Sequence, residues 1–182
     1  MEKKPFVVGK NISLYSIEKD DIDFLTYCNN SVDIRDTFFI NSPTNNLQQE
    51  KVFENLYKSN LNYLPFIVYE NSSMEKIGIT AFHRLDLVNR ATTYSIILPN
   101  KKYWGKHYGS EVTALMLNYG FDILNLNRIQ LHVAINNKPA VKIYEKNGFI
   151  KEGTLREAMY HNNKYCDFFV MSILRNEFYK KD

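Results

Sequence analysis

The chain has 182 residues, of which 45% are hydrophobic, 14% aromatic and 24% charged, and its net charge is +3. This length predicts a single domain over residues 1–182 that needs no disulfide or structural metal, and the aromatic content excludes a disordered chain. No apolar run approaches the ~20 residues of a membrane span or resembles a signal peptide, and Cys28 and Cys166 make no disulfide framework. A cytoplasmic protein without a membrane partner is therefore expected.

The first half of the chain predicts a strand, two helices and three further strands. Residues 10–18 alternate between polar and apolar, and a helix capped by Asp20 or Asp21 follows. The polar residues 31–46 predict a loop with broken helix. An amphipathic helix is expected over 47–59, with its buried face formed by Val52, Phe53, Leu56 and Tyr57. Three β-type runs then predict an antiparallel meander, at residues 64–70, 76–85 and 91–98.

The second half predicts a helix, a strand, a short helix and a closing hairpin. The first helix spans 109–124, and its expected buried residues are Val112, Leu115, Met116, Tyr119 and Ile123. Residues 128–135 alternate as a strand, and a short helix begins at Asn137 or Lys138 and ends at Gly148. The hairpin pairs residues 149–157 with 165–174. The fold class is therefore mixed α/β (α+β), with six to seven strands and about four helices.

The segment Pro99–Glu111 joins a strand to a helix and contains two glycines and Lys106. Such a junction directs free backbone N–H groups and the positive end of the helix dipole at one point. Glycines let the backbone approach a ligand closely, so the segment predicts a cradle for a phosphate or pyrophosphate. It matches neither a Walker A loop nor a GxGxxG fingerprint. The alternative is a glycine-containing loop that binds nothing.

The segment Asn136–Phe149 predicts a capped two-turn helix with Ala140 and Tyr144 on one face. A small residue beside a phenol leaves space for a ligand next to a proton donor. The alternative is that Tyr144 is an ordinary core residue, since the chain has 13 tyrosines.

Taken in order and about 30 residues apart, W-G-K-x-Y-G-S and N-x-x-A-x-x-x-Y-x-K-x-G-F resemble the GNAT N-acetyltransferase superfamily. The likeness covers most of the chain. The segment LNYGFDILNLNRIQLHV is especially similar to the ribosomal-protein N-terminal acetyltransferases and the spermidine acetyltransferases. The resemblance implies a mostly antiparallel sheet flanked by helices and splayed between the fourth and fifth strands.

The resemblance also implies acetyl-coenzyme A (acetyl-CoA) as co-substrate and a primary amine as acceptor. The splayed strand end that binds the pantetheine arm carries onto Ile96, Ile97 and Leu98. The pyrophosphate loop carries onto Trp104, Gly105, Lys106, His107, Tyr108, Gly109 and Ser110. The second motif carries the cofactor contacts onto Asn137, Ala140, Tyr144 and Lys146. The resemblance places Tyr144 near the sulfur of the cofactor. We hypothesise that Tyr144 is the catalytic general acid, because its phenol can give a proton to the departing thiolate or hydrogen-bond it.

Two departures from the family pattern stand out. The family usually has glycine where this chain has His107, and a non-glycine residue with positive φ is uncommon and strained. Thr92 and Thr93 stand in a strand where relatives often carry a glutamate, so the usual carboxylate base is missing. His83, Glu70 and Asp86 are the alternative bases, and a chain of water molecules is an equal candidate.

Other function classes have weaker support in the sequence. The four histidines lack metal-ligand spacing, so no metal site is expected. Scattered basic residues do not indicate nucleic-acid binding. An acyl-CoA-binding protein with little catalysis and a non-enzymatic nucleic-acid or protein interaction module remain as alternatives. The acceptor stays open between a protein N-terminus, a polyamine and another small-molecule amine, and family habit suggests a homodimer.

Overall fold

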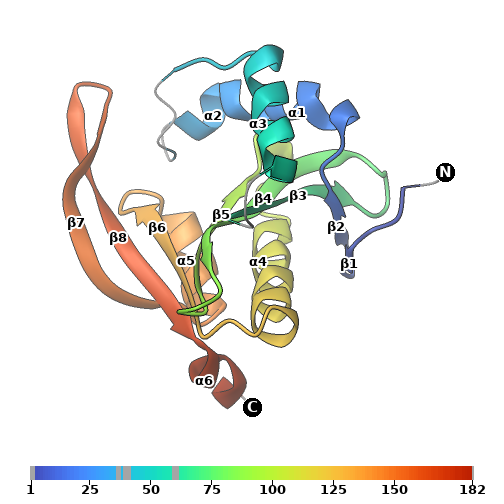
Figure 1. Cartoon of the computed structure of the whole chain (residues 1–182). Helices are drawn as coiled ribbons and strands as arrows, with labels where there is room; N and C mark the ends of the chain where they lie inside the picture. The colour runs from blue at the N-terminus through green and yellow to red at the C-terminus, as the bar shows by residue number, and fades with distance from the viewer. Residues whose placement is uncertain (1–2, 36–37, 39–41, 59–61, 182) are drawn as a thin grey trace.

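The computed structural model describes residues 3–35, 38, 42–58 and 62–181 (Figure 1). Within these residues eight strands form one sheet, in the order β1-β2-β3-β4-β5-β6-β8-β7. Neighbouring strands are antiparallel except β5 and β6, which are parallel. The strands are β1 (Val7–Val8), β2 (Ile12–Ser16), β3 (Tyr63–Glu70), β4 (Lys76–Asp86), β5 (Ala91–Ile97), β6 (Arg128–Ala134), β7 (Ile150–His161) and β8 (Lys164–Leu174). The helices are α1 (Ile22–Asn30), α2 (Val32–Arg35), α3 (Asn46–Lys58), α4 (Tyr108–Asn118), α5 (Lys138–Lys146) and α6 (Arg175–Phe178).

The mixed α/β prediction is confirmed, but the described strands outnumber the predicted six to seven. The additional strand is β1, whose two residues pair with Ser13 and Leu14 of β2. Two residues are too few to show alternation, so only their pairing reveals the strand. The helix α2 lies within residues 31–46, where a loop with broken helix was predicted. The helix α6 was not predicted, because four residues barely complete one helical turn.

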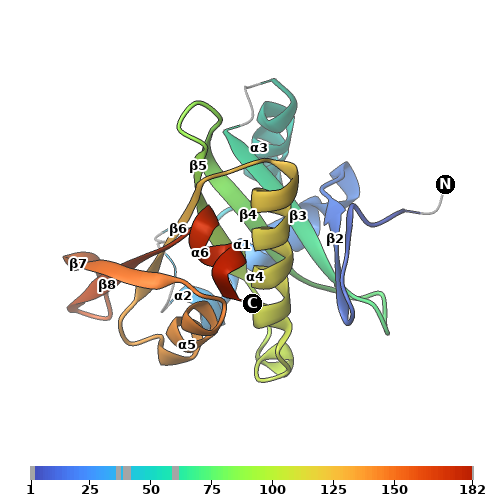
Figure 2. The same ribbon diagram turned by 90° about the horizontal axis from the view of Figure 1, so that it is seen from below.

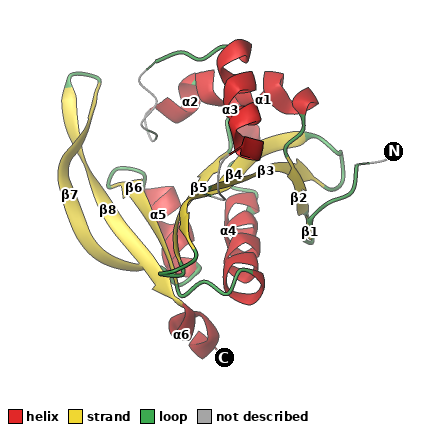
Figure 3. Cartoon of the chain, in the orientation of Figure 1, coloured by secondary structure: helices red, strands yellow, loops and turns green. Residues whose placement is uncertain are grey.

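The helices cover both faces of the sheet. The helices α1, α2 and α3 lie on one face, and α4 and α5 lie on the other (Figures 1 and 3). Figure 2, seen from below, shows α4 and α5 in front of the strands. The β7–β8 hairpin extends away from both layers (Figure 1). This arrangement gives the central strands two different environments on their two faces.

The sheet is splayed where its two parallel strands separate. Pairing between β5 and β6 covers only Ala91 to Thr93 opposite Arg128 to Gln130. The strand β5 continues to Ile97 and β6 to Ala134 without pairing to each other. The strands that separate are the two that were predicted, at 91–98 and 128–135. Because backbone groups at this end lack a partner strand, they are available to a ligand.

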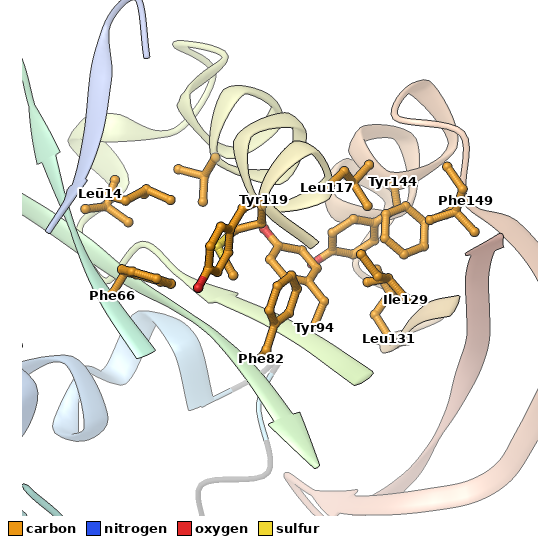
Figure 4. Close-up of a cluster of buried hydrophobic side chains, with 14 of the residues drawn as sticks. Leu14, Phe66, Phe82, Tyr94, Leu117, Tyr119, Ile129, Leu131, Tyr144 and Phe149 are labelled. Atoms are coloured by element: carbon orange, nitrogen blue, oxygen red, sulfur yellow. The ribbon is translucent and has the colours of Figure 1, made fainter. Parts of the chain in front are cut away.

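The main core lies between the sheet and α4 and α5, and it combines aliphatic side chains with several aromatic rings (Figure 4). The Phe82 ring stacks on the Tyr119 ring with centroids 6.2 Å apart, and the Tyr94 ring meets the Tyr144 ring edge to face. Rings of this size remove a large apolar area from water, and edge-to-face pairs add to that stabilisation. The core therefore fixes α4 and α5 against β5.

Two residues predicted to be buried are exposed. Ile123 is 67% exposed because α4 continues into a π-helix at Tyr119–Ile123, whose wider turn rotates Ile123 away from the sheet. Val52 is 45% exposed because it borders an open cavity described below. The side chain of Tyr57 and residue Ser59, the predicted end of the helix, lie outside the described part of the chain.

Candidate active site

The splayed end of β5 has two different faces. Ile97 is buried and packs toward α1 with Cys28 and Ile34, whereas Ile96 and Leu98 pack against the core beneath α4. The Leu98 carbonyl accepts a hydrogen bond from Trp104 Nε1 at 2.9 Å. The three residues assigned to the pantetheine arm therefore lie where the sheet opens.

The loop from Lys101 to His107, hereafter the cofactor loop, connects β5 to α4. It begins with a 3₁₀ turn at Lys101–Tyr103 and contains two residues in the left-handed region, Gly105 with φ 75° and His107 with φ 65°. Only glycine adopts such angles without a steric cost, so the left-handed conformation expected at His107 is present on a non-glycine residue. His107 is also the residue that precedes the first turn of α4.

The N-terminus of α4 offers unpaired donors. Its first helical hydrogen bond runs from the Glu111 N–H to the His107 carbonyl at 3.0 Å. The N–H groups of Tyr108, Gly109 and Ser110 therefore have no partner within the helix. A Cβ built on Gly105 meets nothing within 4 Å, so there is open space at the loop. Free donors, the helix dipole and this space fit the pyrophosphate of coenzyme A.

The second motif forms α5, which packs beside α4. Asn137 caps α5 because its Oδ1 accepts a hydrogen bond from the Ala140 N–H at 3.3 Å. Asn147 Nδ2 donates to Ser110 Oγ at 3.1 Å, which joins the end of α5 to the start of α4. The structure thus brings the two motifs together, while the side chain of Lys146 is exposed.

Tyr144 lies in the core side of α5 and is only 8% exposed. Its ring packs against Tyr94 and Phe149, and burial raises the pKa of its phenol above the usual value. Among the described residues no side chain hydrogen-bonds its hydroxyl. The hydroxyl is therefore protonated at neutral pH and able to donate to a ligand.

A cavity of about 140 Å³ lies on the opposite face of the sheet, under α1 and α3. We call it the acceptor cavity, because it is the candidate site for the acceptor amine that the family resemblance implies. Its lining is mostly apolar with several neutral polar groups, and comprises Ile17, Leu25, Asn29, Phe38, Gln49, Val52, Phe53, Leu56, Tyr63, Ile79, Thr80, Ala81, His83, Ser95 and Ile97. Ser95 and Ile97 belong to the splayed strand, so the cavity meets the open end of the sheet.

His83 is the one proposed base that lines the acceptor cavity. Its Nε2 lies 2.7 Å from Ser95 Oγ, and its ring contacts that of Tyr63 at 4.8 Å between centroids. Burial first, and the charge of Arg84 second, lower the pKa of His83, which keeps the imidazole neutral. A neutral imidazole can accept a proton.

The other two proposed bases are engaged elsewhere. Glu70 accepts hydrogen bonds from the hydroxyls of Tyr108 and Ser73, and Asp86 accepts hydrogen bonds from the backbone of Val88 and Asn89. These contacts lower the pKa of both carboxyls. Neither residue lines the acceptor cavity.

Two contacts of this region could not be predicted from the sequence. Ser95 reaches His83 because β4 and β5 are neighbours, and Glu75 accepts a hydrogen bond from the Tyr103 hydroxyl across 28 residues of chain. No local spacing links either pair. In the described part of the chain no group of three His, Cys, Asp or Glu residues could hold a metal, and no helix is long and apolar enough to cross a membrane.

Known proteins are similar to this chain over between about half and nearly all of its length. A family model described as an acetyltransferase (GNAT) domain matches residues 11–150. The spermidine N(1)-acetyltransferase of Vibrio cholerae serotype O1 is 29% identical over 173 residues, which cover 94% of this chain and 97% of that enzyme. The putative ribosomal N-acetyltransferase YdaF of Bacillus subtilis is 30% identical over 100 residues, which cover 55% of this chain and 54% of that protein.

A solved structure is also similar to this chain. The crystal structure of the V. cholerae spermidine N-acetyltransferase in complex with CoA and spermine has a TM-score of 0.84 and 28% identity, and covers 94% of this chain and 99% of that chain. The two chains therefore share one fold. The chain belongs to the GNAT acetyltransferase family, and it is an acetyl-CoA-dependent N-acetyltransferase.

Proposed function

We propose that the protein acetylates a primary amine of a small molecule that enters through the acceptor cavity. One observation carries the proposal, namely that the two faces of the same strand end meet two different sites. Ser95 and Ile97 line the acceptor cavity, whereas Ile96 and Leu98 pack toward α4. An amine and a thioester would therefore approach each other from opposite faces of the sheet and react directly.

The proposed cofactor contacts are based on the free N–H groups and the open space at the N-terminus of α4. The backbone at Ile96, Ile97 and Leu98 would bind the pantetheine arm. The pyrophosphate would be bound by the cofactor loop and the first turn of α4, at Trp104, Gly105, Lys106, His107, Tyr108, Gly109 and Ser110. The N–H groups of Tyr108, Gly109 and Ser110 would donate to it, whereas the Trp104 N–H already donates to the Lys101 carbonyl. The face of α5 that carries Asn137, Ala140 and Tyr144 would line the arm, and Lys146 would add a positive charge near the phosphates.

We assign deprotonation of the amine to His83. A primary amine with a lysine-like pKa of ~10.4 is neutral in about one molecule in several thousand at pH 7, so a nearby base assists the reaction. His83 lines the acceptor cavity and is held by Ser95 at 2.7 Å. A His83→Gln enzyme with kcat/KM within twofold of the parent would assign this step to water instead.

We assign protonation of the departing thiolate to Tyr144. Its hydroxyl keeps its proton at neutral pH, because burial of the residue raises the pKa of the phenol. Ala140 precedes it by four residues on α5, so a small side chain lies beside the phenol. The thiolate that leaves acetyl-CoA would take up this proton or be stabilised by a hydrogen bond from it.

The leading candidate for the acceptor class is a polyamine, and the competitor is an amine without a second positive charge. The relatives described as spermidine N-acetyltransferases favour a polyamine. The lining of the acceptor cavity favours an amine without a second positive charge, because none of the described residues around it is Asp or Glu. A polyamine carries further cations, which bind best beside carboxylates.

Release of free thiol from acetyl-CoA, measured with a panel of amines, tests the proposal. The panel contains spermidine, spermine, an apolar monoamine and a short peptide with a free N-terminus. The monoamine matches the polyamines in reactivity but lacks their additional charges, and the N-acetylated peptide is the unreactive control. The highest kcat/KM identifies the acceptor class, and no release above spontaneous hydrolysis with any of them would contradict the proposed function.

Cellular location is proposed separately. Cys28 and Cys166 are both free thiols, which is typical of a reducing compartment such as the cytoplasm.

A further inference from the structure

Tyr103 lies within the cofactor loop and Tyr108 directly follows it, and each donates its hydroxyl to a carboxylate of the same turn. The Tyr103 hydroxyl donates to Glu75, and the Tyr108 hydroxyl donates to Glu70. Glu70 ends β3 and Glu75 immediately precedes β4, so both carboxylates flank the β3–β4 turn. A segment more than 25 residues away in sequence thus contacts both ends of the loop.

Further contacts join the loop to the same turn. Lys102 Nζ lies 2.9 Å from Glu75 Oε2. Lys106 Nζ lies 5.8 Å from the Tyr103 ring centroid and 6.0 Å from that of Tyr108, within the range of a cation–π contact. The phenols, the carboxylates and the two lysines therefore form one connected cluster.

The backbone between the two tyrosines needs such support. Gly105 and His107 both have positive φ, and a non-glycine residue in that region carries a steric cost. Without tethers at both ends, the loop would relax toward less strained conformations. Such conformations would point the first N–H groups of α4 away from a common ligand.

We propose that Glu70 and Glu75 are positioning residues for coenzyme A, which hold the cofactor loop in its binding conformation through Tyr108 and Tyr103. The inference rests on the proposed assignment of this loop to the pyrophosphate. Hydrogen bonds to a carboxylate are stronger than those between neutral groups, and tethers at both ends reduce the conformational freedom lost on binding.

The charge of the carboxylates makes the proposal testable. Their two possible roles predict opposite changes in coenzyme A affinity when a carboxylate is removed. Coenzyme A is a polyanion, so an acidic side chain near its phosphates repels it. If Glu70 acted only through its charge, its removal would tighten binding. If Glu70 positions the loop, its removal weakens binding even though a repulsion is lost.

The experiment compares Tyr108→Phe, Glu70→Ala and Glu70→Gln with the parent enzyme. Trp104 is the chain's single tryptophan and lies in the cofactor loop, so its fluorescence reports coenzyme A binding without catalysis. The matched control is Tyr179→Phe, because the Tyr179 hydroxyl donates to Asp122 beyond the far end of α4. Steady-state kinetics with acetyl-CoA provide kcat and KM for each variant.

We expect Tyr108→Phe and Glu70→Ala to raise the Kd for coenzyme A and the KM for acetyl-CoA about tenfold, the change that corresponds to about 1.4 kcal/mol. The kcat should stay within about twofold, because no reacting atom contacts either residue. Glu70→Gln keeps an acceptor oxygen for the phenol, so it should restore near-parental affinity. The control should match the parent.

Two results would overturn the proposal. One is unchanged or tighter binding in both Tyr108→Phe and Glu70→Ala, which would leave the carboxylate as a charge or a bystander. The other is an equal loss in Tyr179→Phe, which would indicate a general loss of structure. The proposed cofactor site itself would be refuted if coenzyme A changed neither the Trp104 fluorescence nor the melting temperature of the parent enzyme.

Discussion

At the scale of single residues, Tyr144 differs from the other core tyrosine beside it. The Tyr94 hydroxyl is paired with Thr113 Oγ1 at 3.1 Å, whereas the Tyr144 hydroxyl has no partner among the described side chains. Replacing Tyr144 with Phe should lower kcat by about 10²–10⁴ with little change in the Kd for coenzyme A, because a proton donor is lost and the ring is kept. Rapid thiol-release kinetics measure this. Tyr94→Phe is the control and should keep kcat, and a Tyr144→Phe enzyme within twofold of the parent would remove Tyr144 from the mechanism.

His107 provides the second prediction at this scale. Its φ of 65° carries a cost that glycine avoids, so His107→Gly should raise the free energy of unfolding by about 0.5–1 kcal/mol. The gain is smaller than the full steric cost because glycine loses more entropy on folding. Urea denaturation measures it. Lys106→Gly is the matched control, since Lys106 is not among the positive-φ residues, and it should be destabilised instead. A stability loss at both positions would show that His107 is not strained.

At the scale of elements, β4 closely approaches the end of β5 that separates from β6. A Cβ on Gly78 would lie 2.3 Å from the Ile97 carbonyl oxygen and 2.6 Å from Leu98 Cδ2. Since a backbone oxygen cannot yield as a side chain does, Gly78→Ala should displace this strand end and lower the free energy of unfolding by about 1–3 kcal/mol. Affinity for coenzyme A should fall with it. Gly153→Ala is the control because open space surrounds Gly153. Normal coenzyme A binding by a destabilised Gly78→Ala variant would show that this strand end does not contribute to the cofactor site.

Elements with a long periodic pattern were the ones that the sequence could predict. Alternation of Ile129, Leu131 and Val133 located β6, and all three are buried. The pattern failed at Ile123, because a π-helix changes the period that the prediction assumes. It also missed β1, which is defined by pairing with β2 rather than by its own two residues. Long-range pairing is not encoded in any local period.

The candidate site could also be predicted only in part from the sequence. The two motifs located the cofactor loop and Tyr144, because each motif is a continuous stretch of sequence. The contact of His83 with Ser95 depends on the alignment of β4 with β5, and that of Glu70 with Tyr108 spans 38 residues. The register of a sheet and the packing of a turn on a loop fix such contacts. They emerge only once the chain is folded.

At the scale of the whole molecule, the sheet separates two binding regions. The helices α4 and α5 lie on the proposed cofactor face, and α1 and α3 cover the acceptor cavity on the other (Figure 1). Each region is built from segments that are distant in sequence. A ligand that bridges β5, α4 and α5 therefore joins parts that must all be folded to bind it, so binding should stabilise the entire fold rather than one loop.

Thermal unfolding tests this coupling. Coenzyme A at about 100 times its Kd adds about 2.7 kcal/mol to the free energy of unfolding, which for a chain of this size raises Tm by roughly 5–10 °C. ATP is the control ligand, because it is a polyanionic adenine nucleotide without a pantetheine arm, and it should shift Tm far less. An equal shift with ATP would mean that the free N–H groups of α4 bind phosphates without help from the splayed strands. No shift at millimolar coenzyme A would contradict the fit at this helix terminus and point to His107 as the cause.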